Sequence, residues 1–357
     1  MLKLFFKEYP LFIATLALVA ILPLEHTIAS SVIGNFGGMF VIFAVIIYLA
    51  MSVAHHAEIL AHKYGNPYGT LILTVAAVLV EIVIIVIMMN NSHNPTLARD
   101  TIYSAIMLDI NGLLGLSAII GGIKYGEQQY NIDSTNSYMS MILVAIGISM
   151  VIPNFINSSH IENYYNFMII LFIILYAIFT RVQLKEHKYF FEYKKDIDQK
   201  NHEDTKENIN GLYHATILVV SIVLIGILSE ILSLFMENSL KTFGLPLELG
   251  AFMVAIISAS PELITAVKAA GDDDMQTVVN IAVGASLATV LLTIPSVLIV
   301  SKFIHFHIEL ALTPIEGIML GLTILTGIIN FNDGETNVLE GFVHFVLFIL
   351  FFYLMFI

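Results

Sequence analysis

The sequence predicts an all-α polytopic membrane protein, and three observations predict it: the composition, a series of apolar segments and an internal repeat. Of the 357 residues, 58% are apolar and only 12% are charged, whereas soluble proteins carry roughly 25% charged residues. The mean hydropathy is +0.87. A folded soluble surface still needs polar cover, so this composition excludes a soluble globular enzyme, a disordered chain and a coiled coil.

The charge and the residue types exclude further classes of function. The formal net charge of −13 argues against nucleic-acid binding, which needs a basic surface. The chain has no Cys, so a disulfide framework, a thiolate nucleophile and a Cys-ligated metal site are excluded. It has no Trp either, so anchoring at the membrane interface falls to the 15 Tyr residues.

Eleven apolar segments follow one another along the chain, each near the length of about 20 residues that a transmembrane helix needs. Pro, Gly, Asn and charged residues separate them, at residues 9–24, 36–54, 68–89, 101–122, 138–156, 164–181, 212–236, 249–270, 277–301, 308–329 and 337–357. The N-terminus resembles the start of a signal peptide, but no clear cleavage pattern of small residues follows it and many more spans come after. Residues 1–30 are therefore predicted to be an extra N-terminal transmembrane helix.

The distribution of basic residues predicts the orientation. With the N-terminus in the cytoplasm, twelve of the 15 Lys and Arg residues lie on the cytoplasmic side and three lie outside. This asymmetry is typical of cytoplasmic loops and supports an odd number of spans. Residues 182–211 are dense in charge and poor in apolar runs, so they are predicted to be a cytoplasmic linker.

The two halves of the chain that flank this linker resemble each other. Residues 57–69 and 229–250 both contain a Glu-Ile-Leu sequence and then an aromatic-Gly-x-Pro sequence before a long apolar helix. Residues 31–181 and 212–357 are therefore predicted to be two five-helix repeats. Because each repeat has five spans, the second is inverted in the membrane. Inverted repeats are typical of secondary transporters, whose binding site lies near the bilayer midplane.

One acid lies deep inside the corresponding helix of each repeat: Glu81 in the first and Glu262 in the second. A carboxylate at the centre of a membrane helix costs about 2.5–3.5 kcal/mol, so such residues normally face a cavity, a partner or an ion. No basic residue lies mid-span near either acid. Two carboxylates at one cavity bind a hard cation such as Ca²⁺, and they repel each other when empty, which favours proton uptake. Cation and proton then compete for the same oxygens.

Other polar residues at membrane depth are candidates for the same site. Asp109 is either a third ligand or a buried hydrogen-bonded residue. Ser258 precedes Pro261, which removes a backbone donor and is predicted to disturb the helix and free carbonyl oxygens for an ion. Ser286 offers a hydroxyl, although Ser commonly only packs between helices.

Three further acids are candidates for gating or a proton pathway: Glu58, Glu230 and Glu316. Glu58 and Glu230 fit a solvated or interfacial face equally well. His55, Glu58 and His62 share one helical face, which fits an exposed cytoplasmic surface better than a Zn²⁺ site.

These residues carry a resemblance to a known family. The segments AHHAEILAHKYGNPYGTLILTVAAVLVE, SASPELI, NIAVGASLATVLLTIP and DGETNVLEG resemble the repeat motifs of the cation/proton exchangers of the calcium/cation antiporter superfamily, and in particular its bacterial ChaA-type Ca²⁺(Na⁺,K⁺)/H⁺ antiporters. The resemblance covers residues 50–357 and implies that the family's key Glu residues fall on Glu81 and Glu262. The Gly-Asn typical of positions before each Glu is replaced by Ala77-Val78 and Ser258-Ala259, and Asp109 stands where the family has an Asn.

The residues and the resemblance together predict a secondary antiporter of the cell (inner) membrane that exports Ca²⁺, and also Na⁺ or K⁺, in exchange for H⁺. Glu81 and Glu262 are its expected metal ligands, with Asp109, Ser258 and Ser286 beside them. Its expected partners are the lipid bilayer and the transported cations; no cofactor is expected, and the oligomeric state stays open. The alternatives are a Na⁺/Ca²⁺-type exchanger and a monovalent Na⁺(K⁺)/H⁺ antiporter. An intramembrane enzyme is not favoured, because His214 and His344 stand alone in the sequence.

Overall fold

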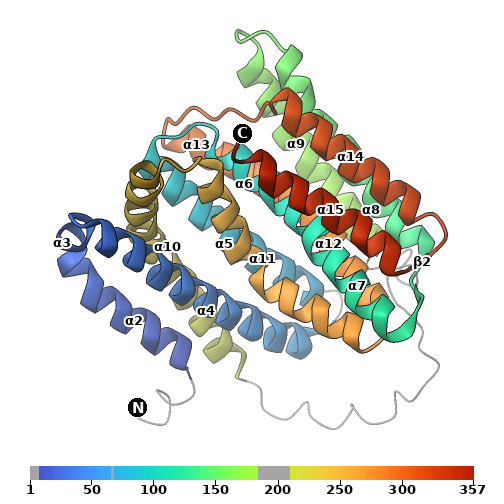
Figure 1. Ribbon diagram of the computed structural model, residues 1–357, viewed down its shortest axis with the longest axis horizontal. Helices are drawn as coiled ribbons and strands as arrows, with labels where there is room; N and C mark the ends of the chain where they lie inside the picture. The colour runs from blue at the N-terminus through green and yellow to red at the C-terminus, as the bar shows by residue number, and fades with distance from the viewer. Residues whose placement is uncertain (1–7, 66–67, 184–209) are drawn as a thin grey trace. The chain divides into compact units, whose positions relative to one another are not determined.

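The computed structural model describes residues 8–65, 68–183 and 210–357 (Figure 1). Within these ranges, nine helices are long and apolar enough to cross a membrane, and two shorter apolar helices follow at Pro314–Asn330 and Val338–Leu354. Together, these long and short helices coincide in number and order with the eleven predicted spans, and they confirm the all-α polytopic membrane class. Most of the predicted linker, residues 184–209, lies outside the described residues.

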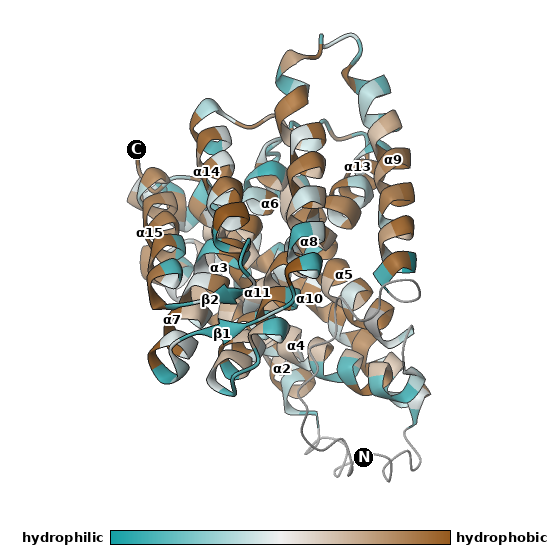
Figure 2. Ribbon diagram, turned by 90° about the vertical axis from the view of Figure 1, so that its right-hand side faces the viewer, coloured by the Kyte–Doolittle hydropathy of each residue, from teal (hydrophilic) through white to brown (hydrophobic). Residues whose placement is uncertain are grey.

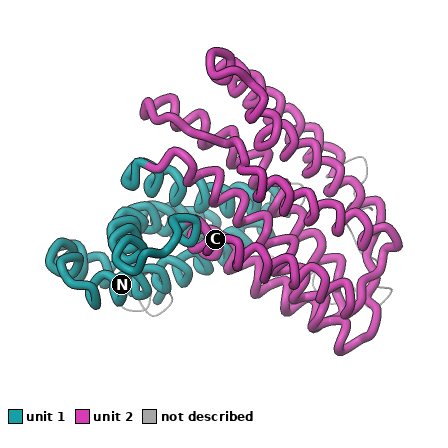
Figure 3. The backbone as a smooth tube through the Cα atoms, turned by 45° about the horizontal axis from the view of Figure 1, so that its top comes forward, with its two compact units in different colours: residues 1–93, 194–250 teal, residues 94–193, 251–357 magenta. Residues whose placement is uncertain are grey.

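The chain divides into two compact units, which Figure 3 shows in different colours. The first contains residues 1–93 and 194–250, and the second contains residues 94–193 and 251–357. Each unit combines segments from before and after the predicted linker. The units are therefore not the predicted repeats, which are defined by sequence order.

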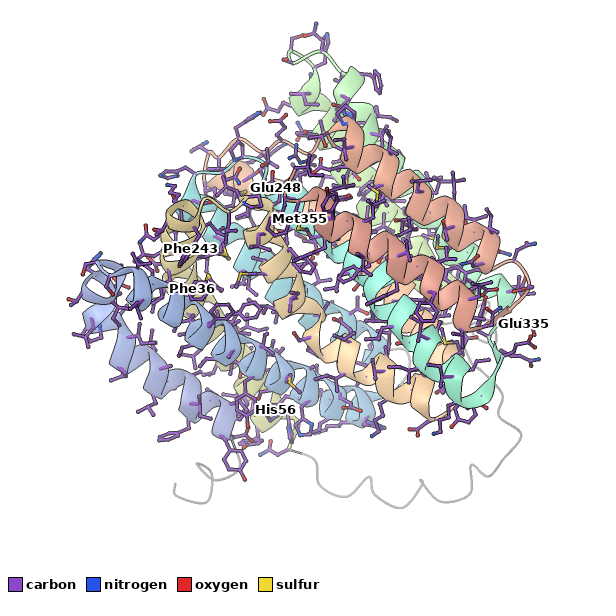
Figure 4. The ribbon with its side chains drawn as sticks, viewed as in Figure 1. Phe36, His56, Phe243, Glu248, Glu335 and Met355 are labelled. Atoms are coloured by element: carbon purple, nitrogen blue, oxygen red, sulfur yellow. The ribbon has the colours of Figure 1, made fainter. Side chains whose placement is uncertain are left out.

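The first unit is built from long helices that pack side by side. Its elements are α2 (Tyr9–Ile21), η1 (Leu22–Leu24), α3 (Glu25–Ala29), α4 (Val32–Tyr64), α5 (Tyr68–Ser92) and α10 (Gly211–Phe243). The rings of Phe36 and Phe243 meet at one end of the α4–α10 pair, with centroids 5.2 Å apart, and His56 contacts His214 at the other end (Figure 4). Helices α4 and α10 are therefore antiparallel.

The second unit holds the remaining spans. Its elements are α6 (Leu97–Met107), η2 (Leu108–Leu113), α7 (Leu114–Tyr125), β1 (Gln128–Gln129), α8 (Ile132–Ile146), η3 (Gly147–Val151), η4 (Ile152–Phe155), α9 (Ile161–Arg181), α11 (Glu248–Gly271, whose first turn belongs to the first unit), α12 (Met275–Ala288), η7 (Thr289–Thr293), α13 (Ile294–Phe303), α14 (Pro314–Asn330), β2 (Glu335–Thr336) and α15 (Val338–Leu354). Strands β1 and β2 form a short antiparallel pair, with Gln128 opposite Thr336.

Corresponding helices of the two halves have matching lengths. Helices α4 and α10 each have 33 residues, and the continuous spans Leu97–Tyr125 and Met275–Phe303 each have 29. Both 29-residue spans contain a π-helical segment, η2 and η7, and the first residues of these segments are 181 positions apart, as are Glu81 and Glu262. Helix α12 packs on α7, and α6 packs on η7. This crossed pairing shows that the two spans are antiparallel. The inverted repeat itself stays a prediction.

Polar side chains set the start of several helices. Ser31, Asn131, Asn210, Asp274 and Asn337 accept hydrogen bonds from backbone amides in the first turns of α4, α8, α10, α12 and α15, respectively. These caps satisfy amides that have no partner inside the helix. At the other end, α4 stops at Gly65 and α10 at Gly244, both with positive φ, a conformation that glycine adopts without strain.

The predicted span 308–329 is wrong at its start, because residues 308–313 form no helix and α14 begins at Pro314. Ile308, Leu310 and Leu312 are buried in alternation, as in a strand, and the amide of Leu312 donates to the carbonyl of Met150. Thr313 and Glu316 then form a capping box that starts the helix. Apolar residues on both sides of Thr313 and Pro314 concealed the point at which the helix begins.

Apolar side chains cover the outer faces of several helices in the second unit. On α14, Ile318, Leu322, Leu325 and Ile329 are exposed at helical spacing, and Figure 2 shows the same apolar character along α9 and α15. Exposed apolar stripes of this kind are what a lipid environment favours and water does not. They agree with the multi-pass membrane character of the chain.

Helices α7 and α15 approach closely at two glycines. A Cβ atom added to Gly341 would lie 2.7 Å from the backbone nitrogen of Ile119 and 2.9 Å from the carbonyl oxygen of Gly115. Small residues at such crossings let helix backbones pack closely in membranes. Neither neighbour is a flexible side-chain end, so the helices themselves must move if Gly341 gains a side chain.

We therefore expect Gly341→Ala to lower the free energy of unfolding by about 1–3 kcal/mol, the usual cost of overpacking. Gly321→Ala is the matched control, because a Cβ added there meets no atom within 4 Å. It is expected to be neutral or to stabilise α14 by up to about 1 kcal/mol through helix propensity. Thermal unfolding of both variants in detergent, followed by circular dichroism, compares them. Equal melting temperatures would contradict the close approach of α7 and α15.

Candidate functional site

Glu81 lies in α5, one residue past the centre of this 25-residue helix. It is 3% exposed. Val80, Ile84 and Ile85, its neighbours along the helix, are also buried, and α5 packs against α4 and α10 within the first unit. The helix thus places a carboxylate at the centre of a span among apolar side chains, where such a group is costly unless it serves a function.

Glu262 lies between two and three residues past the centre of α11 and is partly exposed. Helix α11 runs from Glu248 to Gly271 with Pro261 inside it. The free carbonyl oxygens that the sequence predicts before Pro261 stay a prediction. The hydroxyl of Ser258 donates to the carbonyl of Ala255, and the hydroxyl of Ser260 donates to the carbonyl of Ile256. Ser258 lies one turn before Glu262, so both are on the same face of α11.

Asp109 and Ser286 are brought together by the fold of the second unit. The Ser286 hydroxyl donates to Oδ2 of Asp109 over 3.1 Å, and the two residues are 0% and 3% exposed, respectively. Asp109 lies in the π-helical segment η2, and Ser286 lies in α12, three residues before η7. π-Helical turns are rare and occur frequently at functional sites. Two of the predicted site residues, 177 positions apart in sequence, are therefore hydrogen-bonded partners.

The three predicted gating acids lie in different environments. Glu58 and Glu230 are exposed on α4 and α10, which agrees with the solvated face considered for them. Glu316 is the capping-box acid of α14: its Oε2 accepts from the backbone amide of Thr313 over 2.7 Å. Glu316 also lies 3.8 Å from the Arg99 guanidinium. Its observed contacts therefore hold the start of a helix.

Sequence reasoning missed a buried charge cluster at the start of α6. Arg99 Nε donates to Oδ1 of Asp100 over 2.7 Å, and its Nη1 donates to the carbonyl of Ala311 over 3.0 Å. Asp100 also accepts from the hydroxyl of Thr96 over 2.8 Å. Through Ala311, the cluster holds the segment before α14 against the start of α6. The adjacent Arg and Asp were a visible signal, but Ala311 is 212 positions from Arg99.

A second missed cluster lies in the first unit, and it corrects the expectation that His214 stands alone. His56 Nδ1 is 2.8 Å from His214 Nδ1, and His56 Nε2 is 3.0 Å from a carboxylate oxygen of Glu8. The hydroxyl of Tyr213 donates to the other oxygen of Glu8. These contacts join the start of α2, the last third of α4 and the first turn of α10. His55 and His62 are exposed on α4, as the sequence predicted.

His344 does not stand alone either. Its Nδ1 lies 3.0 Å from the Oδ1 of Asn111, in the same π-helical segment that carries Asp109. Within the described ranges, no group of three or more His, Asp and Glu side chains is arranged to hold a metal ion. Of the predicted site residues, Asp109, Ser258, Glu262 and Ser286 belong to the second unit and Glu81 belongs to the first.

Known proteins show similarity over nearly the whole chain. The profile of the sodium/calcium exchanger protein family matches residues 34–185 and 213–357. The sodium-potassium/proton antiporter ChaA of Escherichia coli (strain K12) is 30% identical over 304 residues, which cover 84% of this chain and 83% of that protein. The Ca²⁺/H⁺ antiporter ChaA of Bacillus subtilis (strain 168) is 27% identical over 233 residues, which cover 64% of this chain and 66% of that protein.

Two solved structures share the fold. Native YfkE superimposes with a TM-score of 0.75 at 22% identity, covering 96% of this chain and 99% of that chain. The H⁺/Ca²⁺ exchanger CAX superimposes with a TM-score of 0.67 at 16% identity, covering 97% of this chain and 88% of that chain.

Proposed function

The chain belongs to the sodium/calcium exchanger protein family, and from this premise we propose that it exchanges a cation for protons across the membrane. Relatives named as cation/proton antiporters in Escherichia coli and Bacillus subtilis support the exchange of cations for protons. Because one is named for Na⁺ and K⁺ and the other for Ca²⁺, the relatives leave the cation open. The rival Na⁺/Ca²⁺-type exchange differs in that Na⁺ replaces H⁺.

The observation that carries the proposal is Glu81, a carboxylate that is 3% exposed at the centre of a span in a family of ion exchangers. We infer that Glu81 and its counterpart Glu262 in the second repeat serve the same cation in alternating access. Their equal positions in the two repeats support this inference. When the cation leaves, the two carboxylates repel each other, and proton uptake relieves the repulsion.

The Asp109–Ser286 pair adds oxygen ligands of two kinds. A hard cation such as Ca²⁺ takes six to eight oxygen ligands, among which carboxylates are preferred. An Asp in place of the family's Asn adds negative charge, and Coulomb attraction favours a divalent ion over a monovalent one. We therefore propose Ca²⁺ as the preferred substrate, with Na⁺ or K⁺ as the alternatives.

We also propose that the protein lies in the cell (inner) membrane, with its N-terminus and residues 182–211 in the cytoplasm.

Everted membrane vesicles that carry a proton gradient test the proposal. Addition of Ca²⁺, Na⁺, K⁺ or Mg²⁺ one at a time should dissipate the gradient, and Ca²⁺ should do so at the lowest concentration. The concentration of Ca²⁺ that gives half the maximal rate should fall as pH rises, because fewer protons then occupy the shared oxygens. Ca²⁺ uptake that needs Na⁺ and leaves the proton gradient intact would favour the Na⁺/Ca²⁺-type alternative, and dissipation by Na⁺ or K⁺ alone would favour the monovalent one.

Asp109→Asn is expected to keep exchange but to weaken Ca²⁺ relative to Na⁺. The amide keeps the hydrogen bond with Ser286 and removes one negative charge, so a divalent ion loses more attraction than a monovalent one. The measurement is the ratio of the half-saturating Ca²⁺ and Na⁺ concentrations at two pH values. An unchanged ratio at both would remove Asp109 from the cation site.

A further inference from the structure

A buried polar network lies beside Asp109, on a different side of the same π-helical segment. Asn111 Nδ2 donates to the hydroxyl of Thr323 over 2.7 Å, and Asn111 Oδ1 lies 3.0 Å from Nδ1 of His344. Asn111 and Thr323 are 0% exposed and His344 is 1% exposed. Asp109 and Asn111 are two residues apart in η2, and they bond to different helices: Asp109 to α12, and Asn111 to α14 and α15.

Close packing of α15 against α7 allows this network to form. His344 reaches Asn111 because α15 lies close to α7 at Gly115 and Gly341, and a Cβ atom added to Gly115 would lie 3.1 Å from the Cβ of His344. The His344 ring stacks on Phe331, with centroids 6.1 Å apart and an angle of 20° between the planes. The ring is therefore packed against Phe331 and held at Nδ1 by the contact with Asn111.

The hydrogen-bond directions in the network define the tautomer of His344. The sulfur of Met107 can only accept, and it lies 3.4 Å from the hydroxyl of Thr323 and 3.6 Å from Nδ2 of Asn111. Both groups therefore donate toward Met107, which leaves Asn111 Oδ1 as the acceptor for His344. Nδ1 of His344 then carries the proton and Nε2 carries a lone pair. Nε2 is buried and has no hydrogen-bond partner among the residues that the structure describes.

We propose that His344 is a positioning residue: as a neutral donor at Nδ1 it fixes Asn111, and through Asn111 it holds the π-helical segment so that Asp109 faces Ser286. A π-helical turn differs from an α-helical turn by one residue, so a shift of η2 back to α-helix would rotate Asp109 away from α12. The contacts of Asn111 with α14 and α15 oppose that shift. The inference rests on the proposed function, because it assigns a role in cation binding at Asp109.

The main rival is that His344 carries a proton at Nε2. The two roles use different nitrogens of the ring, and this difference makes them separable by substitution. In His344→Asn, the amide nitrogen replaces Nδ1 as a donor and nothing replaces Nε2. In His344→Leu, both nitrogens are lost. His307→Asn is the matched control, because His307 is exposed in the segment before α14.

The experiment measures Ca²⁺ and Na⁺ exchange in vesicles and Ca²⁺ binding to the purified protein by calorimetry. We expect His344→Leu to raise the half-saturating Ca²⁺ concentration about tenfold, the lower end of the 10–100-fold typical of residues that orient metal ligands, with a smaller change in the maximal rate. His344→Asn and His307→Asn should stay within about twofold of the parent protein, and all should keep its pH profile. In the Asp109→Asn background, His344→Leu should have little further effect on the ratio of Ca²⁺ to Na⁺ affinity.

Three outcomes would overturn the inference. If His344→Asn loses exchange or shifts the pH profile as strongly as His344→Leu, Nε2 acts as the proton carrier. If folded His344→Leu binds Ca²⁺ as the parent does, or if the parent binds no Ca²⁺ at all, His344 positions no ligand. A parent protein that binds Ca²⁺ without exchanging it would contradict the proposed function only. The calorimetric measurement of Ca²⁺ binding would still test the role of His344.

Discussion

Replacing Glu81 or Glu262 by glutamine is expected to reduce cation/proton exchange to the level of vesicles that lack the protein. Glutamine keeps the shape of the side chain and its capacity for hydrogen bonds, but it neither neutralises a cation nor takes up a proton in exchange for one. Because each acid lies near the centre of its span, no other carboxylate of the same helix replaces it there. The dissipation of a proton gradient by added Ca²⁺, followed with a fluorescent pH probe, measures the loss.

The control for these variants is Glu162→Gln, which removes an exposed carboxylate from the first turn of α9. It should exchange at the parent rate. Equal amounts of monodisperse protein after detergent extraction must accompany each measurement, so that a loss of exchange is not a loss of protein. Near-normal exchange by either Glu81→Gln or Glu262→Gln would remove that residue from the site.

Replacing Arg99 by methionine is expected to lower the free energy of unfolding by roughly 3–5 kcal/mol, the usual effect of breaking a buried ion pair by removing one partner. The Arg99 side chain is 9% exposed and that of Asp100 is 5% exposed. Without the guanidinium, the carboxylate of Asp100 stays buried with its charge uncompensated, and the carbonyl of Ala311 loses a donor. Thermal unfolding in detergent measures the effect.

Two further variants test whether the uncompensated charge of Asp100 causes this loss of stability. In the Arg99→Met background, Asp100→Asn removes the buried charge while its amide oxygen can still accept from Thr96, so it should recover part of the lost stability. Lys241→Met breaks the ion pair between Lys241 and Glu237, whose side chains are 66% and 32% exposed, respectively. This variant should lower the free energy of unfolding by no more than about 1 kcal/mol. If Arg99→Met cost no more than Lys241→Met, the buried pair would contribute nothing to stability.

Properties that depend on single residues or short segments could be predicted from the sequence. The number and order of the spans follow from apolar length, because burying backbone and side chains in lipid imposes a local requirement on every span. The same reasoning identified Glu81, since an acid in the centre of an apolar helix is conspicuous whatever surrounds it. The matched helix lengths of the two halves likewise reflect sequence similarity that was visible beforehand.

Contacts between distant segments were decided only by the tertiary structure. The hydrogen bond of Asp109 with Ser286, the network of Asn111 with His344 and the pair of His56 with His214 each join residues more than 150 positions apart. Which side chains meet depends on how close two helices come and how each is rotated. Glycines such as Gly341 determine how close two helices come. π-Helical segments such as η2 add one residue to a turn and so change the rotation of the side chains that follow. A regular period of 3.6 residues per turn does not predict that change.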